Sequence, residues 1–521
     1  MPGPVIRLPD RMNAAVEFVD AHVETGRGDH LAIVDASDGS RYTYRDVLES
    51  TNRIGNALAE LGVRREERVM LLLHDSPEFV FSFFGAIKIG AVPIPTNTLL
   101  LPADYEYMIN DSRARVLVVS EALFPRIEPI RSNLRDLDHV IVVGNRGAGV
   151  LDYAELTTAA SAELTPADLG KDDVCFWLYS SGTTGFPKGA VHLQHDMTVA
   201  ADLYAKPTLG IDGNDRTFSV AKLFFAYGLG NGLYFPFRVG ATTVLFPERP
   251  EPEAVFGVIE RYRPTIFFSV PTNYARLLEI EDAVDRFDTS SIRLCVSAGE
   301  ALSHALFERW KERFGVEILD GIGSTEILHI FISNRAGRVK PGSTGEIVPG
   351  YEARIADENG VEVPDGEIGD LLIKGDSTCA CYWNRHEETK DTIQGHWIKT
   401  GDKYCRDEDG YLWHKGRSDD MLKVGGIWVS PVEVEHALSQ HPAILECAVV
   451  GVEDGDGLVK TKAFVVLRDR PPVDPAGLAA EIQSFMKGKI AKYKHPRSIE
   501  FLDELPKTAT GKVQRYKLRK R

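Results

Sequence analysis

Apolar runs of strand length alternate with amphipathic segments of helix length through about the first 400 residues of the chain. Three examples are VMLLL (69–73) before EFVFSFFGAIKIG (78–90), RVLVVS (115–120) before EALFPRIEPIRSNL (121–134), and TIFFSV (265–270) before PTNYARLLEI (271–280). A short apolar run bounded by turn residues is typical of a buried strand, and the longer segments are typical of helices. The alternation predicts an α/β fold with mixed or parallel sheets.

The pattern changes near Gly410, where a short, Gly-rich and charged stretch begins. Beyond it the sequence predicts a helix (431–441), two strands (444–452 and 461–469) and a second helix (476–490). These elements would form a compact unit of about 100 residues, a common size for a domain. We expect a large N-terminal α/β domain over residues 1–418 and a small α+β domain over residues 419–521.

Composition and charge narrow the class of protein. With 43% hydrophobic and 26% charged residues, the chain is an ordinary globular sequence. Its net charge is −16, and the 17 Lys/Arg and 13 Asp/Glu from Asp420 onward leave −20 on residues 1–419. An acidic body would repel nucleic acid despite the basic end, so anionic ligands need local cations. The six cysteines are scattered without zinc spacing, which indicates reduced, packed thiols.

We expect a cytoplasmic protein with no membrane partner. The N-terminal sequence lacks an apolar stretch followed by a small-residue cleavage site. The apolar run 79–87 ends at Lys88 and is shorter than the roughly 18 residues that a membrane helix needs.

The stretch YSSGTTGFPKG (179–189) suits a turn that holds phosphate groups. Its glycines permit a tight turn, and its backbone amides can point at an anion. Hydroxyl groups and a positive charge come from Ser180, Ser181, Thr183, Thr184 and Lys188. A Walker A loop needs Gly-Lys-Ser/Thr at its end, whereas Pro187 precedes Lys188 and Gly189 follows it. The stretch is therefore not a P-loop, and by itself it could be an ordinary turn.

Together with six further motifs, this stretch resembles the adenylate-forming family of acyl-CoA synthetases, firefly luciferase and nonribosomal-peptide adenylation domains. The six follow in the family's order: SAGEALS (297–303), DGIGSTE (320–326), GSTGEIVPG (342–350), WIKTGDKY (397–404), GRSDDMLKVGG (416–426) and PKTATGKVQR (506–515). The resemblance implies the family's fold, a large N-terminal α/β domain with a small mobile C-terminal domain. It also implies ATP and Mg²⁺ as cofactors.

The resemblance assigns roles around ATP. Lys512 matches the lysine that stabilises the charge formed when a carboxylate attacks the α-phosphate. Asp402 is expected after a strand, where it would accept hydrogen bonds from both ribose hydroxyls, and Arg417 would contact ribose or phosphate. Glu326 resembles the glutamate that helps to hold Mg²⁺, an ion that prefers oxygen ligands. Lys188 joins Glu326 and Lys512 as a catalytic residue. The adenine slot and adjoining ATP contacts are expected at Ser297, Ala298, Gly299, Glu300, Asp320, Gly321, Ile322, Gly323, Ser324 and Thr325.

Two half-reactions at one carbonyl carbon require pyrophosphate to leave before a thiol arrives. The family rotates its small domain between them, and Asp419 matches the hinge position. After rotation, the loop containing Lys423, Gly425 and Gly426 would line the thiol tunnel, and coenzyme A could also meet Tyr493 and Lys494.

The acyl pocket is expected within KLFFAYGLGNGLYFPF (222–237), which carries no carboxylate. An ammonium group buried there without a partner would be costly, so amino acids are poor substrates. Gly228 and Gly230 would leave a flat space beside aromatic side chains, which suits a ring. FFAYGLGN with DGIGSTEILHIF resembles benzoate-CoA ligases, which implies a pocket of Ala226, Tyr227, Gly228, His329 and Ile330. Ile330 could instead be a core residue, and His329 could bind the carboxylate or a neighbouring carbonyl.

The leading hypothesis is an ATP-dependent aryl-CoA ligase acting on benzoate or a substituted benzoate, as in aromatic degradation. The alternatives are a 4-hydroxybenzoate- or 2-aminobenzoate-CoA ligase, an adenylation enzyme that loads a carrier protein, a non-catalytic nucleotide-binding module, and luciferase-type oxidation. The last is disfavoured by the benzoate-like pocket. A homodimer stays open.

Overall fold

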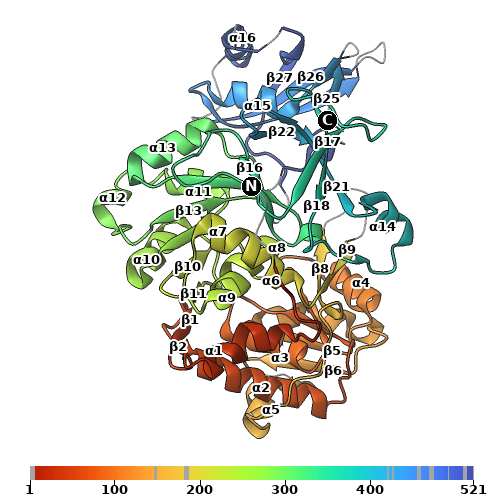
Figure 1. Cartoon of the computed structure of the whole chain (residues 1–521). Helices are drawn as coiled ribbons and strands as arrows, with labels where there is room; N and C mark the ends of the chain where they lie inside the picture. The colour runs from red at the N-terminus through yellow and green to blue at the C-terminus, as the bar shows by residue number, and fades with distance from the viewer. Residues whose placement is uncertain are drawn as a thin grey trace.

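The computed structural model of the chain describes residues 6–145, 149–180, 187–418, 420, 422–424, 427–453, 459–468, 474–487, 489–490, 492–507 and 513–519. The red-to-green part of the ribbon forms a large α/β body, and the blue C-terminal part lies at one end of it (Figure 1). Asp419, the predicted hinge, lies outside the described residues, so the domain boundary stays a prediction.

Two sheets with parallel strands organise the large body. The first has nine strands, in the order β16 (Glu346–Ile347), β15 (Ile330–Ser333), β14 (Ile318–Gly323), β13 (Leu294–Ser297), β12 (Ile266–Ser269), β10 (Arg216–Ser219), β11 (Thr242–Leu245), β1 (Leu31–Asp35) and β2 (Arg41–Thr43). Pairing is parallel from β14 to β1 and antiparallel at both ends. The second is parallel throughout, in the order β4 (Val92–Pro95), β3 (Arg68–Leu72), β5 (Val116–Ser120), β6 (His139–Val143) and β7 (Leu151–Asp152).

Helical segments connect these strands and cover the sheets. In the large body they are η1 (Val16–Asp20), α1 (Ala21–Glu24), α2 (Tyr44–Glu60), α3 (Pro77–Lys88), α4 (Pro102–Ser112), η2 (Glu121–Arg126), η3 (Glu128–Asn133), α5 (Tyr153–Ala159), α6 (Asp196–Ala200), η4 (Ala201–Ala205), α7 (Lys206–Leu209), α8 (Ala226–Leu229), η5 (Gly230–Tyr234), α9 (Phe235–Val239), α10 (Pro252–Tyr262), α11 (Pro271–Leu277), α12 (Ala283–Arg286), α13 (His304–Phe314), η6 (Thr325–Ile327) and α14 (His386–Thr392).

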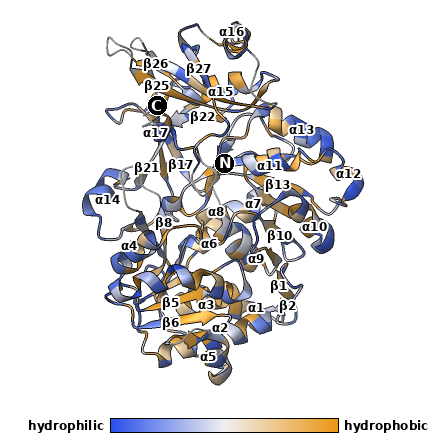
Figure 2. Ribbon diagram, turned by 180° about the vertical axis from the view of Figure 1, so that it is seen from behind, coloured by the Kyte–Doolittle hydropathy of each residue, from blue (hydrophilic) through white to orange (hydrophobic). Residues whose placement is uncertain are grey.

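Strand side chains alternate between separate hydrophobic cores, as the pleat requires. In β12, Phe267 packs in one core with residues of α10, α11 and α13, while Ile266 and Phe268 face the largest core. The largest core also takes Phe83 and Phe84 from α3, so this helix packs between the two sheets. The strands β5 and β6 appear orange in the hydropathy view, as expected for a sheet covered on both faces (Figure 2).

Two smaller sheets lie between the large body and its C-terminal end. One is antiparallel, with β19 (Cys381–Tyr382), β9 (Lys188–Leu193) and β8 (Val174–Ser180) in that order. The other contains β17 (Glu352–Ala356), β18 (Gly369–Lys374), β21 (Trp397–Arg406), β20 (Ile393–Gln394) and β22 (Leu412–Arg417).

The C-terminal unit has its own core and mixed α and β elements. It contains β23 (Leu422–Val424), β24 (Ile427–Val429), α15 (Pro431–Ser439), β25 (Ile444–Glu453), β26 (Val459–Leu467), α16 (Pro475–Phe485), η7 (Lys492–Lys494), β27 (Ser498–Phe501) and α17 (Arg515–Leu518). Val434, Val449 and Ile482 are buried together there. The predicted helices and strands of this unit are all present.

The structure differs from the sequence prediction after β5. The segment 121–134 forms two 3₁₀ helices in place of one α-helix, because Pro125 and Pro129 remove backbone donors that a continuous helix would need. All six cysteines are free thiols. Across the described ranges, no helix combines the length and apolar character needed to span a bilayer.

Close contact between α2 and α3 depends on glycine. A Cβ atom added at Gly85 would lie 2.6 Å from Ile54 Cγ2 and 3.0 Å from the Thr51 carbonyl oxygen. We predict that Gly85→Ala destabilises the large body by about 1–3 kcal/mol through overpacking, measured as a lower thermal unfolding midpoint. Gly257→Ala in α10 is the control, because nothing lies within 4 Å of its added Cβ. It should be neutral or stabilising by up to about 1 kcal/mol. Equal effects of the two changes would contradict the packing argument.

Candidate active site

The predicted phosphate turn is flanked by two paired strands, β8 and β9. Ser180 ends β8 and lies opposite Lys188, which begins β9. Ser181, Thr183 and Thr184 lie outside the described residues. The pairing places a hydroxyl-bearing residue and a lysine at the two ends of the turn.

Distant parts of the chain hold the base of this turn. The Tyr107 hydroxyl, on α4, donates to the Pro187 carbonyl oxygen over 3.1 Å. Arg385 in turn donates to the Tyr107 oxygen over 2.9 Å. The Trp383 N–H donates to the Gly189 carbonyl oxygen over 2.8 Å. The end of the turn is therefore anchored to α4 and to the segment that follows β19.

Glu326 and Lys188 both contact Tyr382 in β19. The Tyr382 hydroxyl donates to Glu326 Oε1 over 2.7 Å. The Lys188 ammonium lies 4.6 Å from the centre of the Tyr382 ring. Burial and the nearby Glu326 carboxylate raise the pKa of Tyr382 above its ordinary value, so its phenol remains a donor at neutral pH. The sequence analysis misses Tyr382, because no local sequence pattern indicates its contact with Glu326, which lies 56 positions away.

The backbone at Thr325 and Glu326 is also held. His192 Nε2 lies 2.8 Å from the Thr325 carbonyl oxygen, and the Cys379 N–H donates to the Glu326 carbonyl oxygen over 2.7 Å. His192 Nδ1 lies 2.8 Å from Asp196 Oδ2, and both side chains are fully buried. Both ring nitrogens therefore face oxygen atoms, so the His192 ring links Asp196 to the backbone at Thr325.

The structure brings the two predicted walls of the adenine slot together. Ser297 in β13 lies opposite Asp320 in β14, and the carboxyl ends of parallel strands are a common place for ligand sites. Burial raises the pKa of Asp320 well above its ordinary value. Gly299 has φ +89°, and Glu300 accepts a hydrogen bond from the Thr272 hydroxyl over 2.8 Å.

The second half of the motif DGIGSTE (320–326) forms a tight backbone turn. A Cβ atom at Gly323 would lie 2.5 Å from the His329 carbonyl oxygen, which explains the glycine. The Ser324 side chain accepts from the Ile327 N–H and caps the short helix η6. Other predicted slot residues are the buried Ala298 and Gly321 and the half-buried Ile322 and Thr325. Their contact with adenine stays a prediction.

Asp402 lies inside β21, whereas the sequence placed it after a strand. Pairing with β22 begins at Asp402, directly after Gly401, whose φ is +77°, so the strand does not end at this glycine. Arg417 is the opposite residue in β22, with Nη1 3.4 Å from Asp402 Oδ1 and 3.1 Å from the Thr400 carbonyl oxygen. The two predicted ribose contacts are thus direct neighbours.

The predicted acyl residues meet in an aromatic cluster. His329 lies 5.6 Å from the Tyr227 ring and 4.3 Å from the Phe235 ring, measured between ring centres. Its Nε2 lies 3.2 Å from the Tyr227 carbonyl oxygen and 3.2 Å from Asn231 Oδ1. Of the two alternatives for His329, the structure shows the carbonyl contact. Burial lowers the pKa of His329 to about 3, so the ring is neutral at physiological pH.

The glycines of this region serve close packing and do not leave a flat space. A Cβ atom at Gly228 would lie 2.0 Å from the Lys222 carbonyl oxygen, and one at Gly230 would lie 2.3 Å from His329 Cδ2. Ala226 begins α8 at the half-buried edge of the cluster. Ile330 is 1% exposed and packs in the largest core, as its core alternative predicted.

A buried carboxyl group that the sequence analysis missed supports the acyl segment. Asp75, between β3 and α3, accepts a hydrogen bond from the Leu223 N–H over 3.0 Å. The neighbouring Lys222 donates to the carbonyl oxygens of Phe246 and, over 2.7 Å, Glu248. Burial raises the pKa of Asp75 to about 6, although Lys222 and the Leu223 N–H act to lower it.

The C-terminal site residues are only partly described. Lys423 lies in β23, and Tyr493 lies in η7, without described side chains. Lys494 contacts Glu433 through both carboxylate oxygens, at 2.6 and 2.8 Å. Gly425, Gly426 and Lys512 lie outside the described residues. The coenzyme A contacts and the role of Lys512 stay predictions.

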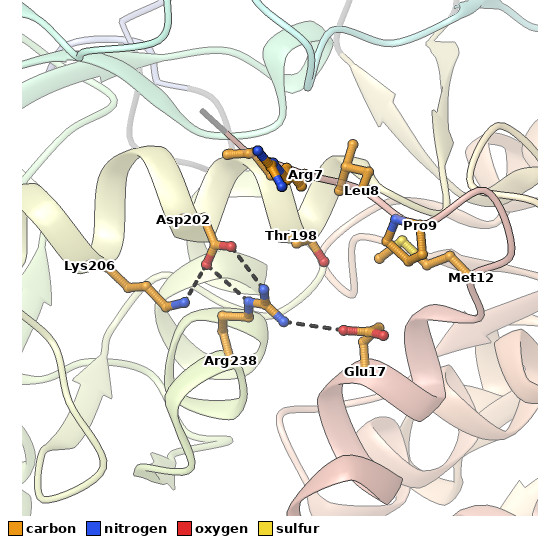
Figure 3. A pocket seen from close by; sticks show the side chains of 10 residues that line it. Arg7, Leu8, Pro9, Met12, Glu17, Thr198, Asp202, Lys206 and Arg238 are labelled. Carbon is orange, nitrogen blue, oxygen red and sulfur yellow. Dashed lines mark hydrogen bonds and ion pairs between the residues drawn. The ribbon is translucent and has the colours of Figure 1, made fainter. Parts of the chain in front are cut away.

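A separate cavity of about 310 Å³ lies beside the N-terminal segment (Figure 3). Four of its charged lining residues form ion pairs: Arg238 contacts both Asp202 and Glu17, and Lys206 contacts Asp202. None of the predicted site residues lines it. It is not the predicted active site.

The residues around Glu326 fit a magnesium ion that is shared with phosphate. The Tyr382 hydroxyl donates to Glu326 Oε1, and Glu326 Oε2 has no hydrogen-bond partner within the described ranges. Those ranges contain no group of three or more His, Cys, Asp or Glu side chains that could hold a metal. A cation at Glu326 would take its other ligands from phosphate and water, as Mg²⁺ commonly does.

Comparisons with known proteins define the family. Residues 19–383 match the family described as AMP-binding enzyme, and residues 433–512 match the AMP-binding enzyme C-terminal domain. A benzoate–CoA ligase of Thauera aromatica is 50% identical over 518 residues, which are 99% of this chain and 97% of the relative.

Two solved structures resemble the whole chain. The anthranilate CoA ligase AuaEII in complex with anthranoyl-AMP has a TM-score of 0.94 and 48% identity, with 98% of each chain covered. A benzoate CoA ligase from Burkholderia xenovorans LB400 has a TM-score of 0.89 and 48% identity, covering 98% of this chain and 99% of the other.

The chain belongs to the AMP-binding enzyme family, whose members form acyl-adenylates. The predicted fold class and the predicted class of acid–thiol ligase, with ATP and coenzyme A as substrates, are confirmed by these similarities.

The raised pKa of Asp75 predicts a pH-dependent loss of stability. A carboxyl group that titrates at about 6 when folded and near 3.9 when unfolded is protonated in both states at low pH and ionised in both at high pH. Burial therefore destabilises the ionised wild type increasingly as pH rises through this window. We predict that Asp75→Asn, which keeps an oxygen acceptor, gains roughly 1–3 kcal/mol relative to wild type between pH 4 and 7. Thermal unfolding midpoints across this range measure it, and a difference that does not change with pH would contradict it.

Proposed function

We propose that this chain is an aryl-CoA ligase that acts on benzoate or a small substituted benzoate. It combines the acid with ATP to form aroyl-AMP and pyrophosphate, and then transfers the aroyl group to coenzyme A. The observation that carries the proposal is the aromatic cluster of Tyr227, His329 and Phe235, in which His329 follows the nucleotide motif DGIGSTE (320–326) closely along the chain. The similar proteins named above are benzoate and anthranilate ligases.

In this proposal the described residues bind and orient ATP. Lys188 and the turn before it hold phosphate oxygens, since an ammonium group and backbone amides favour negative charge. Asp402 accepts hydrogen bonds from the ribose hydroxyls, and Arg417 beside it keeps the carboxylate in place. Bound at Glu326, Mg²⁺ would neutralise charge on the phosphate oxygens.

The acid is bound so that its carboxylate reaches the α-phosphate. The acyl cluster is apolar and aromatic, and its His329 is neutral, so it offers no partner for a buried ammonium group. The Asp75 carboxyl group accepts a hydrogen bond from the Leu223 N–H, and it thereby holds the backbone of the acyl segment. Lys512 then stabilises the negative charge that develops on the α-phosphate during attack. Electrostatic stabilisation of this kind is usually the largest single contribution to the rate.

The second half-reaction needs a thiol at the same carbonyl carbon. Rotation about Asp419 would bring the loop of Lys423, Gly425 and Gly426 to the site, and Tyr493 and Lys494 would meet coenzyme A. A homodimer and a cytoplasmic location belong to the same proposal. The ring substituent stays open, since one similar structure contains anthranoyl-AMP.

We predict that benzoate or a monosubstituted benzoate is the preferred acid. The assay measures pyrophosphate and thioester for benzoate, its hydroxy and amino derivatives, cyclohexanecarboxylate and a medium-chain fatty acid. The aromatic cluster predicts that an arenecarboxylate has the highest kcat/KM. A clear preference for the fatty acid would contradict the proposal. Faster transfer to a phosphopantetheinylated carrier than to coenzyme A would favour the carrier-loading alternative.

A further inference from the structure

Tyr382 contacts both Glu326 and Lys188, two site residues that form no ion pair with each other. Its hydroxyl donates to Glu326 Oε1 over 2.7 Å, and its ring lies 4.6 Å from the Lys188 ammonium. The side chain is 5% exposed, so it is part of the packed wall and not a surface group. Within the described ranges, neither Glu326 nor Lys188 forms an ion pair.

The backbone fixes where the Tyr382 ring can lie. Tyr382 pairs with Ala190 in the β9–β19 register, two residues after Lys188. Its N–H donates to the Thr389 hydroxyl oxygen over 3.0 Å. Strand pairing therefore sets the position of the ring relative to Lys188.

The hydroxyl restricts the carboxylate. A glutamate side chain has several rotamers, and an anchored oxygen removes most of that freedom before a ligand arrives. With Oε1 held by Tyr382, Oε2 has no partner within the described ranges and is available to a cation. An unanchored Glu326 could instead approach the Lys188 ammonium, and each charge would then cancel the other.

We propose that Tyr382 is a positioning residue for the adenylation half-reaction: its hydroxyl aims Glu326 at the metal on ATP, and its ring keeps the Lys188 ammonium apart from that carboxylate. The inference rests on the proposed function, because it takes Glu326 and Lys188 as residues that meet magnesium and phosphate. Tyr382 acts through these two residues and does not touch the reacting atoms.

The test is Tyr382→Phe, which removes the hydroxyl and keeps the ring. Calorimetry with α,β-methylene-ATP measures nucleotide binding to the full-length enzyme with and without Mg²⁺. We expect affinity with Mg²⁺ to fall about tenfold, the scale of one lost hydrogen bond to a charged group. Affinity without Mg²⁺ should stay within about twofold of wild type, because the ring under Lys188 remains. The Mg²⁺ concentration for half-maximal adenylation should rise in parallel.

Tyr44→Phe is the matched control. Tyr44 is also fully buried, and its hydroxyl donates to the Ala241 carbonyl oxygen over 2.8 Å. The same chemical change there should leave both affinities at the wild-type value. Tyr382→Leu also removes the ring, and we expect it to weaken binding without Mg²⁺ as well. Thermal unfolding midpoints confirm that the variants are folded.

Two results would overturn the inference. One is a Tyr382→Phe enzyme with wild-type affinity in the presence of Mg²⁺. The other is an equal loss with and without Mg²⁺, which would indicate a general structural role. Failure of the proposed function is distinct, because it would appear as a wild-type enzyme that binds the nucleotide but forms no aroyl-adenylate.

Discussion

The antiparallel register of β8, β9 and β19 is the constraint on which the site depends. It places Lys188 at the end of the phosphate turn and Tyr382 beside it, within reach of Glu326. Glu326 lies in η6, which follows β14 of the nine-stranded sheet, yet the Cys379 N–H next to β19 donates to its carbonyl oxygen. A shift of one residue between β9 and β19 would turn Tyr382 to the opposite face and separate the carboxylate from its donor. The proposed chemistry therefore depends on this strand pairing.

Buried polar side chains hold the backbone around the site in place. His192 and Asp196 are fully buried and hold the Thr325 carbonyl oxygen. Asp75 and Lys222 hold the acyl segment through backbone groups on either side. These hydrogen bonds fix backbone segments that carry the predicted ligand contacts. The acidic chain as a whole, at −16, does not attract anionic substrates, so local cations such as Lys188 must.

Hydrophobic patterns predicted the strands, because periodicity and turn residues are local signals. The family resemblance placed Ser297 with Asp320, and Asp402 with Arg417, which are neighbours in the structure. Tyr382 and Asp75 were missed, since their contacts join segments that are far apart along the chain. The purpose of Gly228 was misread for the same reason, because the space above it is filled by the Lys222 carbonyl oxygen.

The central claim is that this site transfers AMP to an arenecarboxylate with Lys512 as the stabilising cation. Exchange of radiolabelled pyrophosphate into ATP in the absence of coenzyme A reports this step alone. The account predicts exchange only when an arenecarboxylate is present, and a loss of at least about 100-fold in Lys512→Ala. Exchange without any acid, no exchange with any arenecarboxylate, or full exchange in Lys512→Ala would contradict it.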